Sequence, residues 1–147
     1  MCKAFLILLV SFPLFLSGQN FNSKQFEERV QFSADLLDWP PESDIRIKEI
    51  LPKGFTIDLT DSDKFKYRFK DPQGNRITAY LHIENSNVVY VEFTEGNASF
   101  IEIQKFLTEE KGFEWVGAEH QWNYFNNKKL SIAISPEMTV HVSRYDL

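Results

Sequence analysis

The 147-residue sequence predicts an α+β fold with an N-terminal helix followed by two tandem helix–β-meander repeats. We expect one or two antiparallel sheets with the helices packed on one face. Helix-capping residues precede apolar residues at helical spacing near residues 22–38 and 99–107. Apolar and polar residues alternate between these segments, as they do in strands, and the order of apolar positions in 45–93 recurs in 101–145.

Residues 1–18 have the layout of a secretory signal peptide. Lys3 precedes 13 uncharged residues, Ala4 to Leu16, and the small residues Ser17 and Gly18 follow. A membrane span needs about 20 apolar residues, so we expect no membrane association once this segment is removed. Residues 19–147 then form a single exported domain, periplasmic or extracellular, whose oligomeric state the sequence leaves open.

The composition excludes several classes of protein. Hydrophobic residues make up 43% of the chain, too many for a disordered protein. The net charge of −5 argues against nucleic acid as a partner, because such surfaces need clustered Lys and Arg. The single cysteine, Cys2, lies in the segment expected to be removed, so the mature domain depends on its core rather than on disulfides.

The first expected helix covers about 22–38. Asn22 and Gln25 match a capping box, and Phe21 and Phe26 match the hydrophobic staple that accompanies it. Trp39 and two prolines end the helix. Its apolar face consists of Phe26, Val30, Ala34 and Leu37.

The first repeat, about 45–93, begins with a short helix that Pro52 stops near Leu51. A strand follows, on which Phe65, Tyr67 and Phe69 face one way while Lys64, Lys66, Arg68 and Lys70 form a basic stripe facing the other. The stripe protects a sheet edge or meets an acidic partner. A turn at 71–75 leads to strands at 77–84 and 88–93.

The second repeat, about 101–145, has a clearer helix. Ser99 and Glu102 form a capping box, Gly112 suits the left-handed position that ends a helix, and Phe113 is placed to fold back on the last turn. Turns at 126–127 and 135–136 separate the strands, and we expect Trp115 and Trp122 in the core. The alignment matches Lys53-Gly54-Phe55 with Lys111-Gly112-Phe113, Phe69 with Tyr124, Ile77 with Leu130, and Val91 with Val142.

No motif in the sequence identifies a catalysed reaction. The three histidines, His82, His120 and His141, lack the spacing of a zinc-protease helix, and no glycine-rich phosphate loop or nucleophile elbow is present. We therefore expect no cofactor, no metal and no catalytic residue.

One set of residues is typical of a binding surface. If the strands at 77–84 and 88–93 and the last strand, which contains Val140 to Ser143, share a sheet, their core-facing residues alternate with aromatic and titratable ones on the other face. We predict that this face binds a protein partner, since rigid aromatic groups dominate binding energy. The predicted binding residues are Tyr80, His82, Glu84, Tyr90, Glu92 and His141.

The sequence therefore favours an exported, non-enzymatic binding module, inhibitor- or immunity-like. In topology alone it resembles the small exported inhibitor and PepSY-type modules of bacteria, and no residue role is carried over from them. Two alternatives remain open at this point. One is a small exported hydrolase or metal-dependent enzyme using His82, Glu84 and His141. The other is a carrier of a small apolar ligand bound between helices and sheet.

Overall fold

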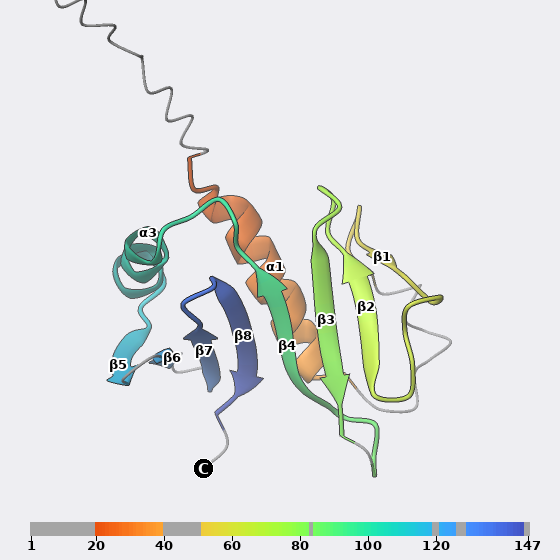
Figure 1. The fold of residues 1–147 in the computed structure, drawn as a ribbon. Helices are drawn as coiled ribbons and strands as arrows, with labels where there is room; N and C mark the ends of the chain where they lie inside the picture. The colour runs from red at the N-terminus through yellow and green to blue at the C-terminus, as the bar shows by residue number, and fades with distance from the viewer. Residues whose placement is uncertain (1–19, 40–50, 83, 119–120, 126–128, 146–147) are drawn as a thin grey trace, which may run out of the picture.

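A computed structural model describes residues 20–39, 51–82, 84–118, 121–125 and 129–145 (Figure 1). The expected signal peptide, nearly all of the helix expected at 45–51 and the turn expected at 126–127 lie outside the described residues. Among the described residues, no helix is both long and apolar enough to cross a membrane.

The described chain is α+β with an antiparallel sheet. The helical elements are α1 (Ser23–Leu37), α3 (Phe100–Lys105) and the π-helical turn η1 (Phe106–Glu110). The strands are β1 (Thr56–Ile57), β2 (Lys66–Lys70), β3 (Arg76–Leu81), β4 (Val88–Thr94), β5 (Glu114–Ala118), β6 (Gln121–Phe125), β7 (Leu130–Ile134) and β8 (Thr139–Arg144).

The strand order is β1-β2-β3-β4-β8-β7-β6-β5, and every neighbouring pair is antiparallel. Four consecutive strands therefore form each half of the sheet, and their last strands, β4 and β8, meet in the middle. We call this junction the seam. Val91 pairs with Val142 and Phe93 with Val140 across it.

Helix α1 packs on one face of the sheet, against β4, β8 and β3 (Figure 1). The Phe26 ring lies 5.8 Å from that of Phe93, and the Phe32 ring lies 5.2 Å from that of Phe69. Both are edge contacts, which aromatic pairs prefer. The strand residues that form this core are Phe69, Ile77, Ala79, Val91, Phe93, Tyr124, Ile132, Ile134, Val140 and Val142.

The local signals for helix ends are confirmed. Of the capping box predicted at Asn22 and Gln25, the structure shows one of the two bonds: the Asn22 side chain accepts from the Gln25 backbone N–H at 3.2 Å. The Phe21 and Phe26 rings of the predicted staple lie 5.7 Å apart. Ser99 and Glu102 make both hydrogen bonds of the capping box. These features depend on residues within one turn of each other, so the sequence specifies them without the rest of the fold.

The second helical segment also ends as expected. Gly112 has φ +68°, and the backbone N–H of Phe113 donates to the Leu107 carbonyl at 2.9 Å. This bond joins residues six apart, one more than in the Schellman ending, and the turn that it closes is the π-helical η1. Phe113 is thereby buried, with 7% of its surface exposed.

The buried face of α1 differs from the expected one. Phe26 and Ala34 are buried as predicted, but Val30 and Leu37 are only partly covered, whereas Phe32, Ser33, Leu36 and Arg29 are buried. The helix crosses the seam and contacts both halves of the sheet, which widens its buried stripe.

Arg29 is 4% exposed and forms the centre of a buried charge cluster. Its Nε donates to Asp71 Oδ2 at 2.8 Å, and its Nη1 donates to Glu95 Oε2 at 2.6 Å. Asp71 lies in the β2–β3 turn and also accepts from the backbone N–H groups of Gln73 and Asn75. The cluster thus ties α1 to the first half of the sheet, since buried charges require partners.

Three expected positions differ at the edges of the sheet. Strand β3 ends at Leu81 rather than at residue 84, because the register with β4 shifts between Tyr80 and Leu81. Beyond that shift Val89, which strand alternation with Val91 and Phe93 predicts to face the core, is 49% exposed. Trp115, also expected in the core, is 48% exposed because β5 is an outer strand of the sheet. The side chain of Trp122 lies outside the described set.

Candidate functional site

The face of the sheet opposite α1 carries the candidate site. Residues along a strand alternate between the two faces, so the buried Ile77, Ala79 and Val91 leave their neighbours on this open face. Strands β3, β4 and β8 lie side by side here, near the centre of the sheet. Backbone pairing on both sides makes these central strands a rigid support.

Four of the predicted binding residues come together on this face, and we call them the open-face cluster: Tyr80, Tyr90, Glu92 and His141. Tyr80 pairs with Tyr90 across β3 and β4, and their rings stack with centroids 4.4 Å apart and an interplanar angle of 16°. Glu92 pairs with His141 across the seam, and the Tyr90 and His141 rings lie 5.9 Å apart. The cluster therefore spans both halves of the sheet.

A short hydrogen bond fixes the cluster. The Tyr80 hydroxyl donates to Glu92 Oε1 at 2.6 Å. This bond to a carboxylate, with partial burial, raises the pKa of Tyr80 to about 12. Burial first, and the charge of Glu92 second, raise the pKa of Tyr90. Both hydroxyls therefore stay protonated to a higher pH than that of an ordinary tyrosine, and the ring of Tyr80 is held in place by its donor bond.

The structure does not bring His82 and Glu84 to this cluster. Both are exposed and lie in the β3–β4 turn, where the His82 Nδ1 accepts from the Glu84 backbone N–H at 3.3 Å. The register shift after Tyr80 ends the strand alternation that placed them on the open face. They belong to the turn, whereas His141 lies within β8.

The metal-dependent alternative required His82, Glu84 and His141 to converge. In the part of the chain that the structure describes, no group of three or more His, Cys, Asp or Glu side chains is arranged to hold a metal ion. His141 instead faces Glu92, with 3.8 Å between its Nδ1 and Oε2 of the carboxylate.

The basic stripe on β2 is largely neutralised by its own neighbours. Lys66 lies 3.9 Å from Asp63, and Lys70 lies 3.7 Å from Asp58. Arg68 forms an ion pair with Asp61, which also lies 3.6 Å from Arg76 of β3. Because the aspartates of the 58–63 loop pair with these cations, the stripe is a poor match for an acidic partner.

A hollow of about 410 Å³ lies beside the cluster on the open face. Glu92 and His141 belong to both. The lining residues are Arg76, Thr78, Glu92, Phe93, Thr94, Ser135, Glu137, Thr139 and His141. Most of them are polar, with four hydroxyl groups and two carboxylates, so the hollow suits a polar group rather than an apolar one.

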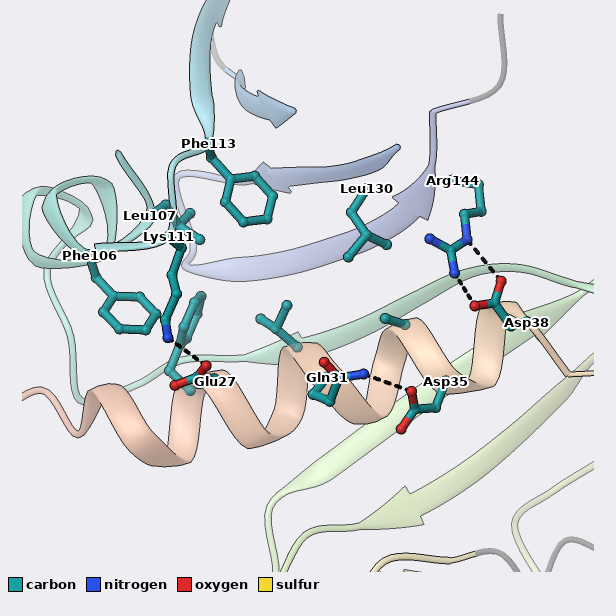
Figure 2. Close-up of a pocket in the computed structure, with 13 residues that line it drawn as sticks. Glu27, Gln31, Asp35, Asp38, Phe106, Leu107, Lys111, Phe113, Leu130 and Arg144 are labelled. Atoms are coloured by element: carbon teal, nitrogen blue, oxygen red, sulfur yellow. Dashed lines mark hydrogen bonds and ion pairs between the residues drawn. The ribbon is translucent and has the colours of Figure 1, made fainter. Parts of the chain in front are cut away.

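A second depression of about 270 Å³ lies on the other side of the sheet, between α1 and the second half (Figure 2). Phe106, Phe113 and Leu130 form part of its apolar wall. Figure 2 shows Lys111 reaching Glu27 at one end and Arg144 reaching Asp38 at the other. The alternative of an apolar-ligand carrier predicts a cavity between helices and sheet, which is where this depression lies. Its apolar wall residues are already buried by the protein itself, and the charges at its rim are paired with each other.

Comparison with models of known protein families, with curated proteins and with solved structures finds no match to this chain. The site is therefore interpreted from its own geometry.

Sequence reasoning missed Thr78, which lies between the two core residues Ile77 and Ala79 on β3. Strand alternation predicts that Thr78 faces the open side of the sheet. Threonine is common on half-exposed strands, so nothing in the sequence marked it as a site residue. Only the structure reveals that it is 5% exposed and lines the hollow.

Proposed function

We propose that the chain is an exported, non-enzymatic binding module that captures a protein partner through the open-face cluster, as inhibitor and immunity proteins do. The observation that supports this most is the stacked Tyr80–Tyr90 pair, held by the Tyr80–Glu92 hydrogen bond on the face opposite α1. Tyrosines that are already ordered lose little entropy on binding and are common binding hot spots.

We also infer that the two halves of the sheet are tandem units with their helices on one face. Pairing Phe69 with Ile77 in the first half corresponds to pairing Tyr124 with Ile132 in the second. Likewise, Ala79 with Val91 corresponds to Ile134 with Val140. This register supports Gly54 with Gly112 and Phe69 with Tyr124 as equivalent positions. It makes Ile132 the equivalent of Ile77 and Val140 the equivalent of Val91, each two residues from the position aligned by sequence.

Two substitutions, made together, test the binding surface directly. The bait is the chain recovered from the extracellular or envelope fraction. Its mass is expected to lack residues 1–18, and it is used to capture partners from the same fraction. We expect Y80A combined with Y90A to reduce capture at least about tenfold, because loss of a hot-spot aromatic costs about 2 kcal/mol or more. A thermal melt checks that the variant remains folded.

The matched control is I101A. Ile101 lies on α3 and is 73% exposed, whereas Tyr80 and Tyr90 are each partly buried. We expect this variant to capture the partner as the wild type does. Capture that survives Y80A/Y90A in a folded protein would contradict the proposal, and recovery of the chain only with residues 1–18 attached would contradict export.

A further inference from the structure

The hollow beside the open-face cluster is lined by Thr78, a threonine that is almost entirely covered. Thr78 is 5% exposed, and its neighbours Ile77 and Ala79 point into the core, so its side chain points to the open face. Within the described residues its hydroxyl makes no hydrogen bond, and since it is not one of the fully buried unpartnered atoms it is accessible from the hollow. An incoming polar ligand would satisfy it.

Glu92 supplies a second open acceptor in the same hollow. Its Oε1 accepts from Tyr80, but its Oε2 lies 3.8 Å from His141 Nδ1, which is too long for a hydrogen bond. The carboxylate side chain is only 27% exposed, so its interaction with a cation is less screened than at an open surface. Glu137, at the rim, is exposed and adds a second negative charge.

The guanidinium of Arg76, which lines the hollow, forms an ion pair with a residue outside it. Arg76 is the one Arg or Lys among the described residues that line the hollow, and its guanidinium lies 3.6 Å from Asp61. The remaining polar lining consists of hydroxyl groups and His141. The lining therefore carries two carboxylates against one guanidinium, and Arg68, the cross-strand neighbour of Thr78, is paired with Asp61.

We propose that this hollow receives an arginine side chain of the protein partner, an inference that rests on the proposed function. A guanidinium has five N–H donors and no acceptor, which matches the open acceptors of Glu92 and Thr78. It also stacks on aromatic rings, and His141 lines the hollow with the Tyr90 ring 5.9 Å from its own. Lysine, a single point charge, would satisfy fewer of these acceptors. The acidic net charge of −5 favours a basic partner as well.

The direct test uses a blocked tripeptide, acetyl-Gly-Arg-Gly-amide, titrated into isotope-labelled protein and followed by the shifts of backbone amide signals. The control peptide carries citrulline in place of arginine, which keeps the shape and removes the charge. We expect shifts that saturate with the arginine peptide at Thr78, Glu92, Thr139 and His141, and none that saturate with citrulline. Equal responses to the two peptides would overturn the inference.

Two variants locate the contact. We expect E92Q to weaken binding of the arginine peptide about tenfold and T78V about threefold, because each loses an acceptor for a charged donor. The control E109Q removes the same charge from exposed η1, where Glu109 lies 4.0 Å from Lys105, and should leave binding unchanged. An equal loss in E109Q and E92Q would mean that overall charge, rather than this hollow, attracts the peptide, and would overturn the proposal.

The same variants separate this inference from the proposed function. If Y80A/Y90A loses the partner but E92Q and T78V retain it, the arginine site is wrong while the binding surface stands. If Y80A/Y90A captures the partner normally, the proposed function fails, and the arginine inference fails with it.

Discussion

Helix α1 is held to the two halves of the sheet by charges of different kinds. In the first half, Arg29 is buried between Asp71 and Glu95, with side-chain exposures of 4%, 1% and 6%. In the second half, Lys111 reaches Glu27 at 2.5 Å, but these side chains are 33% and 51% exposed. The contact geometry is similarly close in both places, and what differs is access to water.

The difference shows that the distance between two charges does not by itself determine how much the ion pair contributes to the free energy of unfolding. Water screens an exposed pair and solvates either partner when the other is removed, so such pairs contribute little. A buried carboxylate has no water to replace a lost cation. We therefore expect the attachment of α1 to the first half to depend on Arg29, and its attachment to the second half to depend on apolar packing, in which Phe106 lies 5.9 Å from Phe26.

The largest expected effect comes from breaking the buried cluster. R29M leaves Asp71 and Glu95 buried without a cation, and we expect it to lower the free energy of unfolding by about 3–5 kcal/mol. K111M removes the exposed pair and should cost about 1 kcal/mol or less. Urea unfolding followed by tryptophan fluorescence measures both. Equal losses would show that burial does not distinguish the two halves.

An intermediate effect is expected from the two glycines that precede the first strand of each half. Gly54 has φ +91° and Gly112 has φ +68°, a region that costs other residues about 1–2 kcal/mol. A Cβ at Gly54 would lie 3.0 Å from Pro72 Cγ, whereas a Cβ at Gly112 meets nothing within 4 Å.

We therefore expect G54A to lower the free energy of unfolding by about 2 kcal/mol and G112A by about 1 kcal/mol. Thermal melts of the two single variants, measured side by side, provide the comparison. If G112A were the more damaging, the contact of a Cβ at Gly54 with Pro72 would not be what distinguishes the two turns.

The smallest effect concerns one tyrosine in each half. The pKa is raised to about 12 for both Tyr80 and Tyr124, in Tyr80 chiefly by the hydrogen bond to Glu92 and in Tyr124 by burial. A folded-state pKa above the ordinary value of 10.0 favours the protonated form. The resulting stabilisation is complete below about pH 10 and is lost as the pH rises towards 12.

E92Q should therefore lower the pKa of Tyr80 and leave that of Tyr124 raised. The ultraviolet absorbance of phenolate, recorded against pH, reports both, and Y80F identifies the signal of Tyr80. A titration of Tyr80 that E92Q does not change would mean that burial, as in Tyr124, is its main cause.

The parts of the fold that the sequence predicts are those that depend on near neighbours. The cap at Asn22, the capping box at Ser99 and the left-handed Gly112 each depend on residues within a turn. The α+β class also follows, because helical and strand periodicities alternate along the chain.

The parts that the sequence does not predict depend on contacts between distant residues. A charged residue such as Arg29 is normally expected on the exposed side of a helix. In the structure it lies on the buried side of α1 with Phe26 and Ser33, and Asp71 and Glu95 pair with it there. Within the candidate site, strand alternation correctly brings Tyr80, Tyr90, Glu92 and His141 to one face. It fails for His82 and Glu84 because it assumes an unbroken strand, and a one-residue shift in register is enough to separate them.

The seam also affects how the chain reaches its native state. The outer hairpins of each half join strands that are adjacent in sequence, and such hairpins form within microseconds. The seam joins β4 to β8, which are separated by the whole of the second helical segment and three strands, so it closes later. Until then, β4 and β8 present unpaired backbone N–H and C=O groups along strands rich in apolar residues. The junction at the centre of the folded sheet is thus the one most open to mispairing during folding.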